Sequence, residues 1–587
     1  SGRWRMSRAS WLGLLTAALL VASGATVVDA ADGPTGGRPT GSALLGRPGA
    51  GSAHDRLVPA GTRPFAGIRR WEADLNTRRA VAGPPSPVAG EPEPSPQVWS
   101  VALRAVDRAG QPAVDGQSGY AVYDLQTARQ VAFGRFAPDT VVELPAGRYA
   151  VRATIVTPAS ADGAESSTMA LRPEITVAGP VDVVLDARPA RRVTVRLADV
   201  DAVPVSASVT VLQEASNGRF VRHEFGDVNF DDRPVFVTPT AGRADTTSYV
   251  YTVWQGAAGL YNLVHRTAGR VPDRLDLRVR RADLAAVRTR YAAQTTEACG
   301  GTYIGPIYRN GPATVSFGTS FALPTRRTEY YLPDPEVAWY TEFAQAADCG
   351  FAELDVQTGA PRTYHRAGAS EEIWNAAPLT PAVAGPTGEP LATRDGDVVT
   401  ARVPLYSDTQ RRRVDFGGPY VGVTGSLALT AADMTPCVSA TFEPLSCVVP
   451  PGTRDFRLTA SARRDVPWSA LSTRSETTWM FRTGTGTGRL PLIGTRYDLR
   501  LDDLNRAPAG RPFGFTVATD PPVPAATLSA STDGGVTWRT VALTPSRDGW
   551  RALVANPVKG GVSLRFTATD SSGSTVTQQV NDAYLVG

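Results

Sequence analysis

Short segments in which apolar and polar residues alternate recur along most of the chain. Examples are "VWSVALRAVD" (98–107), "VVELPAGRYAVRATIV" (141–156) and "PEITVAGPVDVVLDA" (173–187). An apolar residue at every second position turns one face of a β-strand toward a core and the other toward solvent. Turn residues separate these segments at regular intervals, which is typical of small sandwiches. The pattern predicts an all-β protein of tandem β-sandwich domains, immunoglobulin-like or carboxypeptidase-regulatory-like.

Changes in composition and pattern divide the chain into six predicted parts. The segment "AGPPSPVAGEPEPSP" (82–96) is rich in residues that favour an extended, unpacked chain. The predicted layout is a signal peptide (1–30), a disordered Pro/Gly-rich linker (31–97), a β-sandwich (98–187), a β domain with a short helical connector (188–292), a disulfide-containing β region of one or two sandwiches (293–495) and a C-terminal immunoglobulin- or fibronectin-like domain (496–587).

The helical connector is the stretch "RADLAAVRTRYAAQ" (281–294). Asp283 has the side chain of an N-cap residue, and Leu284, Val287 and Tyr291 have the spacing of one helix face. The stretch is the best helix candidate in a chain that otherwise has strand patterns.

The N-terminal residues have the order of a secretory signal. Three arginines precede the apolar run "WLGLLTAALLVA" (11–22), and small residues at Val28 and Ala30 suit a cleavage site. An uncleaved anchor is the second reading, because the run is shorter than the roughly 20 residues of a membrane span. We therefore expect a secreted, extracellular protein with no membrane segment beyond the signal peptide.

The charge pattern argues against a nucleic-acid partner. The 587 residues have a formal net charge of only +4, and Lys559 is the single lysine, so arginine provides almost all positive charge. Acidic and basic residues are mixed, without the basic stripe expected of a nucleic-acid-binding face. The densest basic runs, 278–290 and "RRR" at 411–413, are interpreted as solvated faces.

Four cysteines, Cys299, Cys349, Cys437 and Cys447, occur in a chain that we expect to be exported. An even number in an extracellular context predicts two disulfides. Three connectivities are open, and pairing within each stretch, 299 with 349 and 437 with 447, is favoured. A zinc site is the weaker alternative, because no Cys-x-x-Cys occurs and no histidine has ligand spacing from a cysteine.

The stretch "GTSFALP" (318–324) fits the nucleophile template of subtilisin-like peptidases, with Ser320 at the serine position. A serine hydroxyl needs a neighbouring base to become a nucleophile. None of the four histidines is followed by Gly-Thr, and prolines at 333 and 335 would soon break the helix that should follow. The match is therefore interpreted as coincidental, and no other catalytic or cofactor-binding residue is predicted.

Two further motifs have structural explanations. "STDGGVTW" (531–538) fits the Asp-box pattern, in which Asp533 accepts backbone hydrogen bonds, Gly535 takes a left-handed conformation and Trp538 packs beneath the turn. One copy predicts a hairpin turn rather than a propeller. Carboxylates such as Asp502, Asp503 and Asp570 could hold a structural calcium ion, but their spacing matches no known loop.

Several stretches together resemble a known family. "LPAGRYAVRATIV", "FALPTRRTEYYLPD", "EEIWNAAP" and "LSASTDGGVTWRTVAL" are similar to the non-catalytic region that follows the protease domain in large secreted actinobacterial subtilisin-like peptidases. The resemblance covers roughly 98–587, and the protease domain itself is absent. It implies a secreted, non-catalytic accessory or binding protein, with an extracellular protein or a cell-wall polymer as partner. A serine peptidase with an unusual triad, or a glycan-active enzyme, is the alternative.

Overall fold

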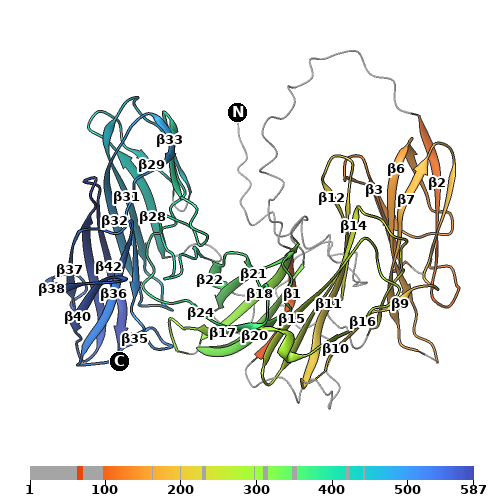
Figure 1. Cartoon of the computed structure of the whole chain (residues 1–587), viewed down its shortest axis with the longest axis horizontal. Helices are drawn as coiled ribbons and strands as arrows, with labels where there is room; N and C mark the ends of the chain where they lie inside the picture. Colours follow the sequence, from red (N-terminus) through yellow and green to blue (C-terminus); the bar gives the residue numbers. More distant parts are fainter. Residues whose placement is uncertain are drawn as a thin grey trace, which may run out of the picture.

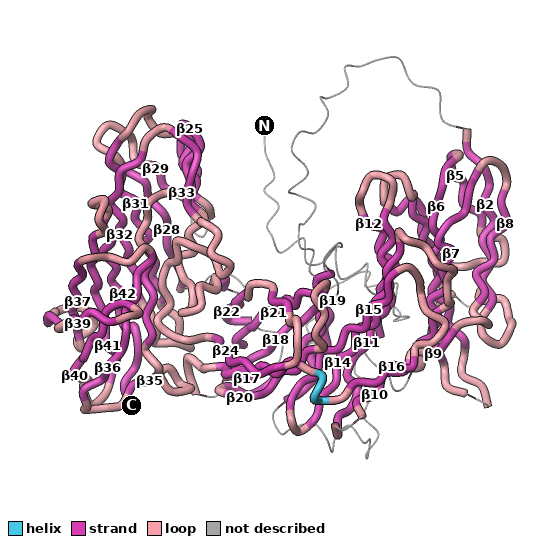
Figure 2. The backbone as a smooth tube through the Cα atoms, in the orientation of Figure 1, coloured by secondary structure: helices cyan, strands magenta, loops and turns pink. Residues whose placement is uncertain are grey.

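The computed structural model describes residues 62–70, 97–114, 116–161, 163–198, 200–227, 233–296, 298–308, 315–346, 353–416, 422–440 and 443–587. Within these ranges the regular elements are β-strands, apart from one 3-10 turn, η2 (Arg281–Asp283), the cyan segment in Figure 2. The prediction of an all-β protein is confirmed. No helix in these ranges has the length and apolar character needed to cross a bilayer. The predicted signal peptide (1–30) lies outside the described residues.

The first sandwich packs a sheet of six strands against a sheet of three (Figure 1). Its core contains Val101, Leu103 and Val151. Val101 and Leu103 alternate with more exposed residues along 98–106, as the sequence pattern predicted, whereas Val151 lies in a strand that is buried at consecutive positions. The larger sheet has the order β4 (Gln130–Arg135), β3 (Gly119–Asp124), β6 (Gly147–Thr157), β7 (Ser166–Val177), β13 (Val235–Val237) and β9 (Arg191–Arg192), and the smaller sheet has the order β5 (Val141–Pro145), β2 (Val98–Val106) and β8 (Val181–Asp186).

A seven-stranded sheet, called here the central sheet, follows the first sandwich. One face packs against β7, β13 and the short pair β10 (Thr194–Leu197) and β16 (Asp276–Val279), and the other packs against a second seven-stranded sheet. Burial on both faces explains why β14 is apolar or weakly polar almost throughout. The order is β12 (Phe220–Asp227), β11 (Ala202–Glu214), β14 (Thr246–Gly256), β15 (Gly259–Ala268), β20 (Thr325–Tyr331), β17 (Ala285–Tyr291) and β24 (Gly368–Trp374).

The second seven-stranded sheet meets the central sheet through aromatic side chains. Tyr251 and Tyr331 of the central sheet lie edge-on to Trp339 of the second sheet, with ring centroids 5.6 and 5.1 Å apart. The order is β1 (Thr62–Arg70), β19 (Val315–Leu323), β18 (Ala298–Tyr308), β21 (Val337–Ala346), β22 (Glu353–Thr358) and β27 (Val414–Phe416), and β23 (Arg362–Thr363) also pairs with β21.

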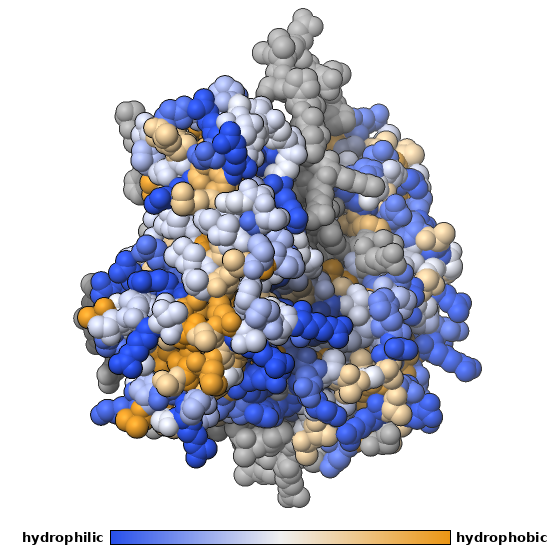
Figure 3. Space-filling model, turned by 60° about the vertical axis from the view of Figure 1, so that its left-hand side comes forward, coloured by the Kyte–Doolittle hydropathy of each residue, from blue (hydrophilic) through white to orange (hydrophobic). Residues whose placement is uncertain are grey.

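The C-terminal lobe, residues 377–587, has one continuous core shared by three sheets, and Val414 of β27 belongs to this core although β27 pairs with β22. Its face in Figure 3 mixes hydrophilic residues with an apolar area. The nine-stranded sheet contains β29 (Cys437–Val438), β28 (Val423–Thr430), β31 (Arg454–Arg464), β32 (Arg474–Thr483), β42 (Thr575–Val586), β41 (Gly560–Thr569), β37 (Ala525–Ser531) and β38 (Arg539–Val541), with β35 (Arg506–Ala507) beside β42. The two four-stranded sheets are β30 (Leu445–Val448), β26 (Val398–Ala401), β25 (Ala392–Gly396) and β33 (Gly486–Arg489), and β34 (Gly494–Asp498), β36 (Pro512–Asp520), β40 (Gly549–Ala555) and β39 (Leu543–Ser546).

Strands from both sides of two predicted domain boundaries share a sheet. β20 and β24, which follow residue 292, complete the central sheet with β17, and β32, which precedes residue 495, pairs with β42. The divisions at 292 and 495 are therefore replaced by a layered middle region and one C-terminal lobe. In each case the hydrogen bonds of a later strand complete a sheet begun earlier in the chain.

Two local predictions are wrong. The helix expected at 281–294 is instead the turn η2 followed by the strand β17. Ala285, Val287 and Tyr291 are buried on one face of this strand, and Arg288 is exposed on the other. The segment 62–70, expected to be disordered linker, forms β1 and pairs with the edge strand β19. An edge strand offers unpaired backbone groups that an added strand satisfies. The rest of the linker up to residue 96 lies outside the described residues.

Candidate functional site

The middle region and the C-terminal lobe meet through buried amides. Asn505 donates from its side-chain nitrogen to the carbonyls of Ala293 and Asn375, 3.0 Å each, and accepts from the backbone of Ala377 at 2.8 Å. Asn505 is 1% exposed and has a φ of 57°, a conformation that asparagine tolerates better than most residues. One side chain therefore joins three segments from distant parts of the chain.

Asn375 holds a second set of buried contacts at this junction. Its amide nitrogen donates to the Ala292 carbonyl and to Gln345, 2.9 Å each, and its Oδ1 accepts from Gln294 at 2.7 Å and Gln357 at 3.0 Å. Both donors and both acceptor positions of the amide are used, as a buried side chain requires. The network fixes the end of β24 relative to β21 and β22.

A buried carboxyl and a buried guanidinium flank this network. Burial raises the pKa of Asp355 to about 6, and burial also lowers the pKa of Arg464. Asp355 accepts from Gln294 at 3.0 Å, and Arg464 donates to Ser469, which itself donates to Gln294. The two groups attract one another across the junction, which lowers the cost of burying both.

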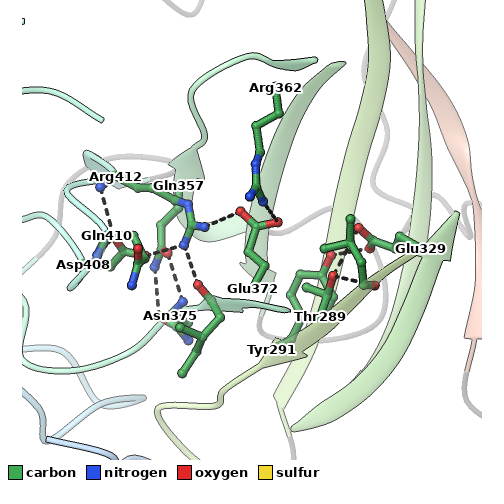
Figure 4. Close-up of polar contacts among 12 residues, drawn as sticks. Thr289, Tyr291, Glu329, Gln357, Arg362, Glu372, Asn375, Asp408, Gln410 and Arg412 are labelled. Atoms are coloured by element: carbon green, nitrogen blue, oxygen red, sulfur yellow. Dashed lines mark hydrogen bonds and ion pairs between the residues drawn. The ribbon is translucent and has the colours of Figure 1, made fainter. Parts of the chain in front are cut away.

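Glu329, 1% exposed, lies between the two seven-stranded sheets. It accepts two hydrogen bonds from Arg327, at 2.9 and 2.7 Å, and one from the hydroxyl of Tyr331 at 3.1 Å. The hydroxyl of Tyr291 donates to it at 2.5 Å (Figure 4). Burial and the nearby carboxylate raise the pKa of Tyr291, so this hydroxyl remains a donor. Arg327 also donates to Thr319 of the second sheet at 3.1 Å. The cluster cross-links the two sheets.

Glu372 and Arg412 form a neighbouring ion pair, also drawn in Figure 4. Their closest atoms are 2.5 Å apart, and Arg412 also pairs with Asp408 at 2.8 Å and lies 3.7 Å above the ring of Trp374. Arg412 is 4% exposed. The interpretation of 411–413 as a solvated basic face is therefore wrong for its middle residue, because a carboxylate on each side and an aromatic face compensate the buried charge.

A cleft of about 1350 Å³ opens beside these clusters, between the middle region and the C-terminal lobe. Among the described residues that line it are ten arginines and four carboxylate residues. Three further carboxylates, Glu329, Asp408 and Asp503, pair with lining arginines from beside the cleft, which leaves a formal surplus of three positive charges. We call it the arginine cleft. A concave surface with charges of one sign concentrates the electrostatic field and attracts counter-charged molecules. Its arginines are Arg288, Arg290, Arg326, Arg327, Arg362, Arg412, Arg496, Arg500, Arg547 and Arg551.

One wall of the cleft is the outer face of the sheet β34-β36-β40-β39. Arg496 of β34 lies opposite Ala518 of β36, and Arg551 of β40 lies opposite Thr516 of β36, so all four share one face. Both arginines are exposed, and neither forms an ion pair with a described residue. They lie on either side of a strand with small side chains, about 10 Å apart across two strand spacings.

The other wall is the end of the central sheet at β20, β17 and β24. Arg288 lies opposite Thr328 and Arg290 opposite Arg326, on the face away from Glu329. Arg326 pairs with Asp503 at 2.9 Å, and Arg290 donates to the Leu501 carbonyl at 3.1 Å. The loop between β34 and β35 therefore lines part of the cleft and is bound to the central-sheet wall.

The sequence motifs lie elsewhere. Ser320 is 4% exposed in the middle of β19, where its strand neighbours are Gly301 and Arg63. His223 and His265 are in strands of the central sheet, and His54 lies outside the described residues. The strand geometry of GTSFALP differs from the helix start that the peptidase template requires. Thr319 of this motif binds Arg327, which gives the stretch a packing role.

The cysteines form at least one of the two predicted disulfides. Cys437 and Cys447 are bonded, with 10 residues of sequence separation, and close a loop at the end of the C-terminal lobe. Cys299 is also disulfide-bonded, and no described cysteine is free. Cys349 lies outside the described residues, so its pairing with Cys299 stays a prediction.

The Asp-box stretch forms the turn between β37 and β38. Asp533 accepts from the backbone of Val536 and Thr537, at 3.1 and 2.9 Å, and these bonds together with the Thr537 hydroxyl hold the pKa of Asp533 well below its usual range. Gly535 has a φ of 89°, in the region that favours glycine. The indole of Trp538 donates to the Gly535 carbonyl at 3.0 Å and packs against Arg565.

The carboxylates considered for calcium have protein partners. Asp502 caps its own turn through the backbone of Leu504 and Arg506, Asp503 pairs with Arg326, and Asp570 accepts from the backbone of Ser574. Across the described ranges, no three His, Cys, Asp or Glu side chains lie close enough together to hold a metal ion.

No local sequence pattern indicates the arginine cleft. Arg288 and Arg290 belong to the basic run 278–290 that was interpreted as a solvated face, and Arg496 and Arg551 are more than 50 residues apart. Only the alternation in "AVRTRY" indicates that Arg288 and Arg290 share a face. The lining brings together segments from across the chain, which no local pattern shows.

Comparisons with known proteins leave the family open. No family model matches the chain, and no curated protein matches it. Among solved structures, a Streptococcal ancillary pilin matches with 12% identity and a TM-score of 0.12 over 47% of this chain and 98% of the pilin. Immunoglobulin domains 1–4 of Sidekick-1 match with 8% identity and a TM-score of 0.11, over 66% and 96% of the two chains. The Bacillus anthracis TIE protein matches with 8% identity and a TM-score of 0.09, over 68% and 74%.

At these TM-scores the likenesses carry no argument about function. The resemblance to the accessory regions of subtilisin-like peptidases stays a prediction, because none of these matches tests it.

Proposed function

We propose that this chain is an extracellular, non-catalytic binding protein whose ligand is anionic and occupies the arginine cleft. The proposal is carried by the surplus of three positive charges in a concave surface, which corresponds to the exposed Arg496, Arg547 and Arg551. The predicted signal peptide and the Cys437–Cys447 disulfide support an oxidising, extracellular setting. Binding rather than catalysis is supported by the position of Ser320, buried in a strand.

The guanidinium group suits this role. Arginine presents a planar set of donors that matches carboxylate and phosphate groups with two parallel hydrogen bonds. Arg496, Arg547 and Arg551 are exposed and have no ion-pair partner among the described residues, so an incoming anion displaces no internal carboxylate from them. Their strand or turn positions on a paired sheet hold their backbones in place before the ligand arrives.

The test compares dextran sulfate with uncharged dextran on the purified chain, by calorimetric titration and thermal unfolding. We expect binding of the charged polymer only, with a rise in unfolding temperature, because a ligand of the folded state adds stability. The double variant Arg496→Gln/Arg551→Gln should bind at least about tenfold more weakly, since each charged hydrogen bond contributes about 1.5 kcal/mol or more.

The matched control is Arg457→Gln/Arg539→Gln. These two arginines are also exposed strand residues of the C-terminal lobe, but they lie outside the cleft. The control should keep its affinity within about twofold, a change of under 0.5 kcal/mol. Equal losses in both double variants, or equal binding of charged and uncharged dextran, would contradict the proposal.

A further inference from the structure

The two walls of the arginine cleft have the same kind of surface. On the lobe side, Arg551 lies directly opposite Thr516, and on the central-sheet side, Arg288 lies directly opposite Thr328. Each wall therefore presents a guanidinium beside a hydroxyl, on neighbouring strands about 5 Å apart. Such a pair can bind an anionic group and an adjacent hydroxyl of the same ligand. On the central-sheet side Arg288 also lies 3.6 Å from the exposed Glu371, an ion pair that a ligand would have to displace.

The size of the cleft points to an extended ligand. Small-molecule pockets are commonly about 300–1,000 Å³, and this cleft has about 1350 Å³ with arginines on both walls. A single carboxylate would neutralise one of the three surplus positive charges. A chain with repeated negative charges would neutralise more of them, and would gain from the high effective concentration of its later charges once the first is bound.

The lining also disfavours two other polyanions. Single-stranded nucleic acids stack their bases on exposed aromatic rings, whereas Tyr497, the aromatic residue among the described lining, is 2% exposed. Arginine clusters also recognise acidic peptides, but a peptide whose side chains are carboxylates offers no hydroxyl to Thr516 and Thr328, which lie opposite Arg551 and Arg288. The lining instead combines arginines, which bind anionic groups, with threonines, which bind hydroxyl groups, and therefore suits a polymer that carries both groups.

We propose that the arginine cleft binds a linear acidic glycan or polyol polymer, a hydroxyl-bearing chain with regularly spaced carboxylates or phosphodiesters, and that the polymer contacts both walls at once. This inference rests on the proposed function and specifies its ligand class. Because the walls belong to the central sheet and to the C-terminal lobe, the bound polymer bridges the middle region and this lobe.

The experiment titrates the full chain with galacturonate and with oligogalacturonates of increasing length, and in parallel with poly(glycerol phosphate). Affinity should rise steeply with length until both walls are engaged, by at least about 100-fold from monomer to the longest oligomer. The better-binding arm identifies carboxylate or phosphodiester as the preferred charge. Poly-L-glutamate and oligo-dT of matched charge should bind at least about tenfold more weakly than the better arm.

Variants of each wall separate bridging from binding at one wall. Arg288→Gln and Arg496→Gln/Arg551→Gln each remove charge from one wall, and each should reduce the affinity for long oligomers by at least about tenfold. The dependence of affinity on salt should weaken with each arginine removed, since fewer ligand charges are neutralised. Arg457→Gln/Arg539→Gln should change neither measurement.

The outcomes distinguish this inference from the proposed function. If galacturonate binds as tightly as the oligomers, or if only one wall matters, the cleft takes a single anion and the polymer inference is wrong while the proposed function stands. Equal or tighter binding of poly-L-glutamate or oligo-dT overturns the ligand class alone. If no anionic probe binds, the proposed function fails as well.

Discussion

Replacing Glu329 by glutamine tests the cluster that links the two seven-stranded sheets. The carboxylate is 1% exposed and accepts four hydrogen bonds of 3.1 Å or shorter, two of them from Arg327. Glutamine keeps the shape of the side chain but removes its charge. Its NH₂ group cannot accept the hydrogen bonds that Arg327 and the two tyrosine hydroxyls donate to the carboxylate. The side chain of Arg327, 11% exposed, is left as an uncompensated buried cation.

The expected loss is about 3–5 kcal/mol of unfolding free energy, the usual cost of removing one partner of a buried ion pair. Urea unfolding followed by tryptophan fluorescence measures it, since Trp339 contacts Tyr331, a member of the cluster. At a slope of about 3 kcal/mol/M, the midpoint of the transition that reports this region should fall by at least about 1 M.

Two variants make the reasoning refutable. Glu371→Gln makes the same chemical change on β24, where the side chain is 80% exposed and lies 3.6 Å from Arg288, and it should cost at most about 1 kcal/mol. Arg327→Met/Glu329→Gln removes both charges and should recover most of the loss. Equal midpoints for Glu329→Gln and Glu371→Gln, or a double variant no more stable than Glu329→Gln, would refute the reasoning.

Three further predictions concern pH, the disulfide and the serine motif. Burial lowers the pKa of His223 to about 3, below the unfolded value of about 6.5, so the unfolded state binds the proton first and stability falls as the pH falls through this window. His223→Phe should remove about 2 kcal/mol of the loss between pH 6.5 and 4.5 in urea unfolding, and an unchanged pH slope would contradict this. Replacing Cys437 and Cys447 by serine should lower the free energy of unfolding by up to about 3 kcal/mol, the closure entropy of a loop of this length. Denaturation with and without reductant measures this loss, and equal stability of the variant and the original chain would contradict the prediction. Ser320 should not react with a fluorophosphonate probe, because it is 4% exposed within a strand; labelling that Ser320→Ala abolishes, with peptide hydrolysis, would favour the peptidase alternative.

Local patterns in the sequence determined which segments are strands. The alternation of apolar and polar residues predicted the strands of the first sandwich and left little room for helices. The turn around Asp533 could also be read from the sequence, because its hydrogen bonds join residues no more than five positions apart. The cysteine spacing favoured the Cys437–Cys447 disulfide for the same reason, since the two residues enclose a short loop.

Ambiguous periodicity explains the wrong helix. Val287 and Tyr291 are four residues apart, a spacing that fits both one face of a helix and alternate positions of a strand. The choice was made by partners far away in the sequence, because β17 fills the place between β20 and β24 and satisfies its backbone hydrogen bonds with both.

The sequence by itself determined the class of fold, the strand faces and the short-range turns. Only the tertiary structure decided which strands share a sheet, and with this the arginine cleft, whose walls come from β17, β20 and β24 on one side and β34, β36 and β40 on the other. Backbone conformation and side-chain alternation depend on neighbouring residues, whereas sheet pairing depends on how distant apolar faces pack together. An arginine exposed on a strand has the same local pattern whether it faces open solvent or another row of arginines across a cleft.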